Sequence, residues 1–276
     1  MTATEPEISP FLLIDSAMLG GTEAYLPMQA DARPDWLLPI YKETAATVSP
    51  LLIDMAAAEQ AGQLDLMMTL FNAMQPQLHA SLIETRLSHD ALAQHLRHFI
   101  FVRLASGDEP TLRFADCAVL PSLAAVLTPA QWAAVVGPTT RWCIHQRCGA
   151  LNDLPLADPG QEPAPTPLTL TAPQDALLTE LEAPDQLIGN LLRRRKGQTL
   201  PGDMAEQHRW ASEAIAQWRA AGHSDNGVLL LLTGAIFDTQ GRLLSYSGLA
   251  DILAQQNAAA INVDLQQAIE RYSGQA

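Results

Sequence analysis

The chain has 276 residues, of which 48% are hydrophobic and 17% are charged, and these proportions exclude a disordered protein. Its formal net charge of −14 at pH 7 argues against sequence-independent binding to DNA, RNA or an anionic membrane, because such binding needs a cationic surface that displaces counterions. A basic or apolar protein partner suits this charge better, and we expect no nucleic-acid partner.

Cysteine usage and hydropathy bear on the compartment. The three cysteines, at positions 117, 143 and 148, are an odd number and do not make a disulfide framework, which favours a reducing cytoplasm. The chain starts without a basic-then-apolar leader. Its longest apolar run, 228–237, has about half of the roughly 20 residues that a membrane-spanning helix needs. The expectation is a cytoplasmic protein without membrane insertion.

Short apolar runs alternate with helical patterns in the first half of the chain. The runs at 11–15 and 50–54 each end in an acidic residue and predict buried strands, and 79–85 predicts a third strand. The alanine-rich segment 56–74 has high helix propensity. This alternation predicts an α/β amino-terminal lobe over residues 1–150, with helices covering at least part of the sheet on both faces.

The centre of that lobe is predicted as a helix followed by a β-hairpin. Ser88 precedes apolar residues at three- and four-residue steps, which predicts a serine-capped helix. Segments 99–104 and 111–114 predict two strands joined by a turn that contains Gly107 and Pro110. This hairpin would make the sheet mixed rather than wholly parallel. Asp116 is then expected to cap a further helix.

The rest of the lobe and the segment after it are marked by proline. Pro129 opens a predicted short helix that Gly137 and Pro138 stop, and a strand is expected at 139–145. Six prolines then fall within 151–173, a spacing that excludes a helix interior or a central strand. That segment is predicted to be a proline-rich linker or a strap between lobes.

Residues 174–276 predict an all-helical carboxyl-terminal lobe. Pro184 is expected to break the first helical pattern into two helices. Segment 204–221 has apolar residues at helical steps, and 228–237 is apolar all round, so the latter should occupy the centre of the bundle.

One short segment has residues that zinc binds. Cys143, His145 and Cys148 supply three possible ligands, but zinc sites usually take four protein ligands, or three and a water, from paired motifs. A strand with buried thiols explains the same residues. We therefore expect no metal and no cofactor, and a metal-dependent enzyme remains an alternative.

The run Ser88, His89, Asp90 contains the residue types of a hydrolase triad. A triad is assembled by residues that meet in space, not by adjacent ones, so a helix cap at Ser88 with Asp90 in the first turn is the preferred interpretation. No nucleophile elbow, phosphate loop, dinucleotide fingerprint or zinc-protease motif occurs. We expect a protein that is not an enzyme, with a hydrolase using Ser88 as the alternative.

Two features of the helical lobe are candidates for contact with a partner. A basic run ends a predicted helix before Gly197, where cations offset the carbonyl pole, although four adjacent cations exceed that need and suit an acidic partner segment. Two tryptophans at helical steps suit either a core or an interface. The candidate partner-binding residues are Arg193, Arg194, Arg195, Trp210 and Trp218.

Polar residues of the central segment have structural interpretations. His95 and His98 lie near a predicted helix end, where imidazoles meet exposed carbonyl groups. An ion-pair network would join arginines to aspartates near the strand ends. The arginines are Arg97, Arg103 and Arg113, and the aspartates are Asp15, Asp54 and Asp116.

An ordered set of residues in this region resembles the signature block of the type VI secretion effector adaptor, or chaperone, family. The family usually has an aromatic residue before the signature aspartate and a proline after it, where this chain has Ala115 and Cys117. The resemblance covers roughly residues 11–146. The signature residues are His95, Leu96, Arg97, Phe99, Gly107, Arg113, Phe114, Asp116, Gly137, Pro138 and Trp142.

The resemblance implies a function without a reactive centre. It implies a non-enzymatic adaptor that holds a toxin effector in the producing cell and helps to load it onto the spike tip, either the trimeric spike protein or its PAAR cap. Such a protein needs a groove for the effector, and the cleft between the lobes is the expected place. An immunity protein that neutralises a toxin is a further alternative.

Overall fold

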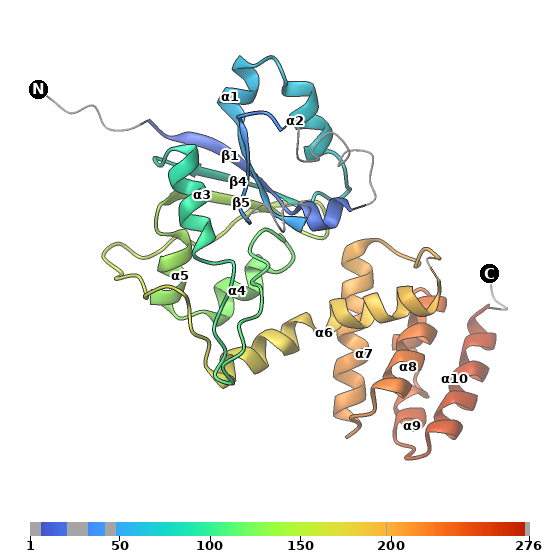
Figure 1. Cartoon of the computed structure of the whole chain (residues 1–276). Helices are drawn as coiled ribbons and strands as arrows, with labels where there is room; N and C mark the ends of the chain where they lie inside the picture. The colour runs from blue at the N-terminus through green and yellow to red at the C-terminus, as the bar shows by residue number, and fades with distance from the viewer. Residues whose placement is uncertain (1–6, 21–32, 42–47, 197, 274–276) are drawn as a thin grey trace, which may run out of the picture. The chain divides into compact units, whose positions relative to one another are not determined.

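In the computed structural model the chain divides into two compact units, Met1–Leu178 and Thr179–Ala276. Within the described residues, the first unit is a β-sheet with flanking helices and the second is built from helices alone, so the predicted two-part fold class is confirmed (Figure 1). The structure describes residues 7–20, 33–41, 48–196 and 198–273.

The apolar runs of the first unit form one six-stranded sheet with the order β2-β3-β1-β4-β5-β6. The three predicted buried strands are present, and the strand expected at 139–145 is also found. All pairings between the described strands are antiparallel. The strands are β1 (Ser9–Ile14), β2 (Leu37–Pro39), β3 (Leu51–Asp54), β4 (Ala80–Thr85), β5 (Thr139–His145) and β6 (Leu151–Asp153).

The strand directions differ from the expected mixed sheet. Strands β3 and β4 each run antiparallel to β1, so they are parallel to each other but are separated by it. The helices α1 (Met55–Gln60) and α2 (Leu64–Phe71) therefore connect two parallel strands that are not neighbours. The alternation of strands and helices was read correctly, but strand order depends on distant pairing, which a local pattern does not specify.

Helices cover both faces of the sheet. Leu12 and Ile14 of β1 pack in one apolar cluster with Met67 and Leu70 of α2. Phe11 alternates with them and points to the opposite face, where its ring stacks on His89 at the start of α3 (His89–Arg97) with centroids 5.7 Å apart. The helices α4 (Leu120–Val126) and α5 (Pro129–Val136) lie between β4 and β5 in the chain (Figure 1).

The predicted hairpin after α3 is reduced to isolated bridges. Phe101 pairs with Thr111, whereas Arg103 pairs in parallel with Thr169. The amide of Arg103 donates to the carbonyl oxygen of Leu168, and its carbonyl oxygen accepts from the amide of Leu170, both at 2.8 Å. The backbone of this loop thus bonds partly to a segment more than sixty residues later, so it does not become a two-stranded hairpin.

The proline-rich segment 151–173 packs along the first unit. It begins with β6, and Leu154, Leu168 and Leu170 are buried. The indole N–H of Trp132 donates to the carbonyl of Pro155 at 2.8 Å. The first unit therefore extends beyond the predicted boundary at residue 150 and ends at Leu178.

The second unit is a bundle around α8, as the apolar run 228–237 predicted. Leu232, Ile236 and Phe237 of α8 are fully buried. Pro184 does not break the first helix in two: α6 is continuous, and Leu187 and Leu191 after the proline pack into the core. The elements are α6 (Ala172–Arg194), α7 (Met204–Ala220), α8 (Asn226–Asp238), η5 (Arg242–Ser245), α9 (Leu249–Leu253) and α10 (Ala258–Ser273).

Candidate binding groove

The signature arginine Arg113 joins two buried carboxylates. It lies 3.0 Å from Asp15 at the end of β1 and 3.0 Å from Asp116 before α4. Asp15 also accepts from the amide of Ala17, and Asp116 accepts from the amide of Ala118 at 2.8 Å. Asp116 therefore holds the turn before α4, although the helix itself begins at Leu120. The cluster ties the sheet to the helices.

The other predicted arginine pairs differ. Asp54 caps α1 by accepting from the amide of Ala57. Arg103 pairs with Glu109 at 2.9 Å on the surface. Arg97 donates from Nε and Nη2 to the carbonyls of Ile40 and Pro39, at 3.0 Å each. Among the described residues, Arg113 alone of the three makes the predicted pairs, because Arg97 binds backbone carbonyls at the end of β2 and Arg103 binds a carboxylate of its own loop.

The remaining signature residues pack the first unit together. Leu96, Phe99, Phe114 and Trp142 are each at most 1% exposed. The indole N–H of Trp142 donates to the hydroxyl of Ser81 at 3.0 Å. These positions have a structural role.

The imidazole of His95 packs between α3 and α5. Its Nε2–H donates to the carbonyl oxygen of Val135 at 2.8 Å, and its ring meets the Phe99 ring edge-on. Burial lowers the pKa of His95 below its usual value. A neutral imidazole with one nitrogen bonded to a carbonyl is a packing element of α3 and α5.

The residues of the possible hydrolase triad are used for local structure. The hydroxyl of Ser88 accepts from the amide of Ala91 and so caps α3, as predicted. His89 donates to the carbonyl of Leu52 at 3.0 Å. Neither contact prepares the Ser88 hydroxyl to act as a nucleophile.

The possible zinc ligands do not form a site. Cys143 is buried in β5, whereas Cys148 is exposed and its thiol lies near the side chain of Gln146. Among the described residues, no group of three or more histidine, cysteine, aspartate or glutamate side chains could hold a metal ion. The segment 143–148 is a strand end with one buried and one exposed thiol.

We predict that only Cys148 reacts with a thiol reagent in the native protein. Burial raises the pKa of Cys117 to about 12, and burial together with Asp153 raises the pKa of Cys143, so both thiolates are scarce near neutral pH. Titration with Ellman's reagent should count one thiol before and three after unfolding. Cys148→Ser should abolish the native reaction. Rapid native labelling of a second thiol would contradict this assignment.

The candidate partner residues of the helical unit lie in different settings. Trp210 and Trp218 are 3% and 2% exposed, so they belong to the core rather than to an exposed interface. Arg195 pairs with Asp238 at 2.7 Å. Arg193 donates to the side chain of Asn190, and both Arg193 and Arg194 are exposed at the end of α6. The expected cap Gly197 lies outside the described residues, and Lys196 has the left-handed conformation, with φ of 52°.

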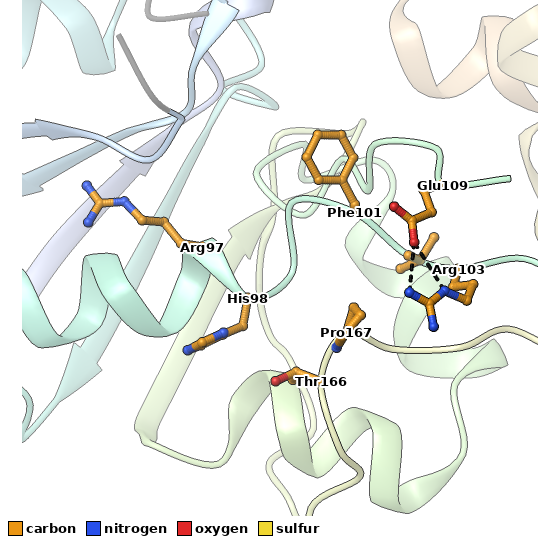
Figure 2. Close-up of a pocket in the computed structure, with 8 residues that line it drawn as sticks. Arg97, His98, Phe101, Arg103, Glu109, Thr166 and Pro167 are labelled. Atoms are coloured by element: carbon orange, nitrogen blue, oxygen red, sulfur yellow. Dashed lines mark hydrogen bonds and ion pairs between the residues drawn. The ribbon is translucent and has the colours of Figure 1, made fainter.

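An open groove lies in the first unit beside the end of α3. One part, of about 350 Å³, is lined by Arg97, His98, Phe101, Arg103 and the neighbouring residues Val102, Glu109, Thr166 and Pro167 (Figure 2). A second part, of about 660 Å³, shares His98 and Thr166 with the first and so adjoins it. Its other walls are α5 and residues 157–164. We call the two parts together the Phe101 groove.

The sequence did not predict this groove. The expected binding place was a cleft between the lobes, whereas the Phe101 groove lies wholly within the first unit. Phe101 was assigned to a strand, yet its side chain is 51% exposed. The alternation of the run gave no signal for this exposure, because it places Phe99 and Phe101 on the same face, whereas only Phe99 is buried.

The fold and the groove define the class of protein. It is a chain of two units whose polar signature residues stabilise the fold and whose first unit has an open surface groove. Residues 10–134 match the family model described as "Domain of unknown function (DUF4123)". This match runs from β1 into α5. It contains the Arg113 cluster and the groove residues between 97 and 109. No curated protein and no solved structure matches the chain. No helix among the described residues is long and apolar enough to cross a membrane.

Proposed function

We propose that this chain is a non-enzymatic adaptor of type VI secretion. It binds a toxin effector in the cytoplasm of the producing cell and helps to load it onto the spike tip, which is the trimeric spike protein or its PAAR cap. The observation that carries this proposal is the match of residues 10–134 to the DUF4123 model, together with the signature residues that resemble the effector adaptor family.

The geometry supports binding over chemistry. Polar atoms of four signature residues bond to groups of the same chain. His95 and Arg97 donate to carbonyl oxygens, Arg113 pairs with carboxylates, and Asp116 accepts from a backbone amide. The Phe101 groove is open and lined by side chains of mixed chemistry, as a surface for another polypeptide is.

Co-expression with any toxin or spike-tip protein that the neighbouring genes encode tests the proposal. The tagged full chain should co-purify with the toxin, and deletion of the chain should stop delivery of the toxin while the spike protein is still secreted. The absence of a complex with any neighbouring toxin or tip protein would count decisively against an adaptor. Protection of a sensitive cell by this chain alone would identify an immunity protein instead.

A further inference from the structure

The Phe101 groove places an exposed aromatic ring beside cationic side chains. From this we infer that the groove binds an extended segment of the partner that carries an apolar side chain flanked by aspartate or glutamate. The inference rests on the proposed function, since it identifies the surface that would grip the effector or the tip protein and the chemistry it would recognise.

The apolar part of the groove is a ring that water contacts. Phe101 is 51% exposed, whereas the adjacent Val102, which also lines this part of the groove, is 3% exposed. Pro167 lines the same part of the groove (Figure 2). Covering such a ring with an apolar side chain removes apolar surface from water and provides a central anchor of the kind that dominates peptide binding.

The first part of the groove is cationic although the protein as a whole is acidic. The chain has a net charge of −14, yet Arg97, His98 and Arg103 line one pocket, in which Glu109 is the single acidic residue among those that the structure describes. Glu109 bonds Nε and Nη2 of Arg103 at 3.1 and 2.9 Å. Because Glu109 pairs with Arg103, Arg97 has no carboxylate partner among the described residues of the pocket. A carboxylate on the partner would complement it.

Arg97 is also held in place before a partner arrives. Two of its nitrogens donate to the carbonyls of Pro39 and Ile40, and it has no ion pair within the described part of the chain. A guanidinium fixed by neutral acceptors keeps its charge and loses little side-chain entropy when it meets a carboxylate. His98 adds a second donor on the same side (Figure 2).

The shape favours an extended chain over a compact ligand. The two parts of the groove, of about 350 and 660 Å³, follow one another through His98 and Thr166. The second part is walled by the small side chains Ala133 and Ala134 of α5 and by residues 157–164. Because Phe101, Arg103 and Thr166 remain exposed, the groove is too shallow to enclose most of a small molecule, as small-molecule sites do.

Variants of the full chain test the inference in complexes with the neighbouring toxin and tip protein. Phe101→Ser removes the anchor, and His98→Glu adds a like charge for an acidic segment. Phe101→Leu keeps an apolar side chain and should restore binding. The matched control is Leu151→Ser, because Leu151 is 64% exposed on β6 and does not line the groove. All four proteins should keep the melting temperature of the parent chain.

A second arm needs no natural partner. Three fluorescein-labelled octapeptides are used: one alternates glutamate with leucine, one glutamate with serine, and one lysine with leucine. Each is titrated with the protein, and binding is followed by fluorescence anisotropy. We expect the glutamate–leucine peptide to bind, with Kd raised about tenfold or more by Phe101→Ser or His98→Glu and unchanged by Leu151→Ser. The lysine–leucine peptide can bind elsewhere on an acidic protein, but that binding should ignore the groove variants.

The outcomes separate the two proposals. A toxin or tip complex that is lost in both groove variants and kept in the control supports the inference. A complex that survives both, with peptide binding equally unaffected, overturns the groove while the adaptor function stands. Variant-sensitive peptide binding without any natural complex supports the groove and removes the adaptor function. Preference of the groove for the lysine–leucine or glutamate–serine peptide overturns the acidic and apolar chemistry.

Discussion

Trp210→Ala is expected to unfold the helical unit and to leave the first unit folded, at a cost of about 4 kcal/mol in the free energy of unfolding. The indole is 3% exposed and meets the Phe237 ring edge-on, with centroids 5.4 Å apart. Gly202 and Gly241 lie directly against it, so the backbone is shaped around the ring and cannot close the cavity without moving. Truncation of Trp210 removes its packing in the core and also the ring surface against which the loops of Gly202 and Gly241 lie.

Hydrogen exchange read separately for residues 48–178 and 198–273 measures this loss. Protection of α7 and α8 should fall, whereas protection of β1, β4 and β5 should not. Val263→Ala is the control, because Val263 is 53% exposed on α10 and its truncation should change stability little. If the exchange protection of α7 and α8 were unchanged and a partner complex were lost, Trp210 would be an interface residue rather than a core residue.

Arg113→Met is expected to destabilise the first unit by about 3 kcal/mol, the lower end for a broken buried ion pair. The substitution leaves the carboxylates of Asp15 and Asp116, which are 4% and 5% exposed, without their shared cation. The lower end applies because the Arg113 side chain is itself 52% exposed and water can partly replace it. Chemical denaturation followed by tryptophan fluorescence measures the change.

Two further variants show whether the loss comes from the uncompensated carboxylates. Adding Asp116→Asn to Arg113→Met should recover part of the stability, because one of the two stranded charges is removed. Arg103→Met is the matched control: its pair with Glu109 is exposed on both sides and should contribute less than about 1 kcal/mol. If Arg113→Met and Arg103→Met lowered the free energy of unfolding equally, the Arg113 cluster would contribute no more stability than an exposed ion pair.

The sequence predicted elements whose signals are local. Ser88 caps α3, and the short helix that Pro129 was predicted to open is α5. The uniformly apolar run 228–237 became the centre of the helical bundle. Caps and hydrophobic periodicity act over three or four residues, so their outcome depends little on the rest of the fold.

Predictions that needed a distant partner were less accurate. The expected mixed sheet is antiparallel because β1 lies between β3 and β4. Pro184 lies inside a continuous helix because the residues after it pack into the core, which outweighs one missing backbone hydrogen bond. Whether Trp210 and Trp218 faced the core or a partner could not be read from helical spacing alone, which is the same for both.

The sequence by itself determined the two-part architecture, the starts of α3 and α5, the buried strands and the acidic character of the chain. Only the tertiary structure decided that Arg113 meets Asp15 across 98 positions, and that residues 97–109 and 157–167 form one groove. The groove exists because the backbone of Arg103 bonds to Leu168 and Leu170. Such backbone pairing uses N–H and C=O groups that every residue except proline carries, so the side chains along the chain do not indicate which two segments will meet.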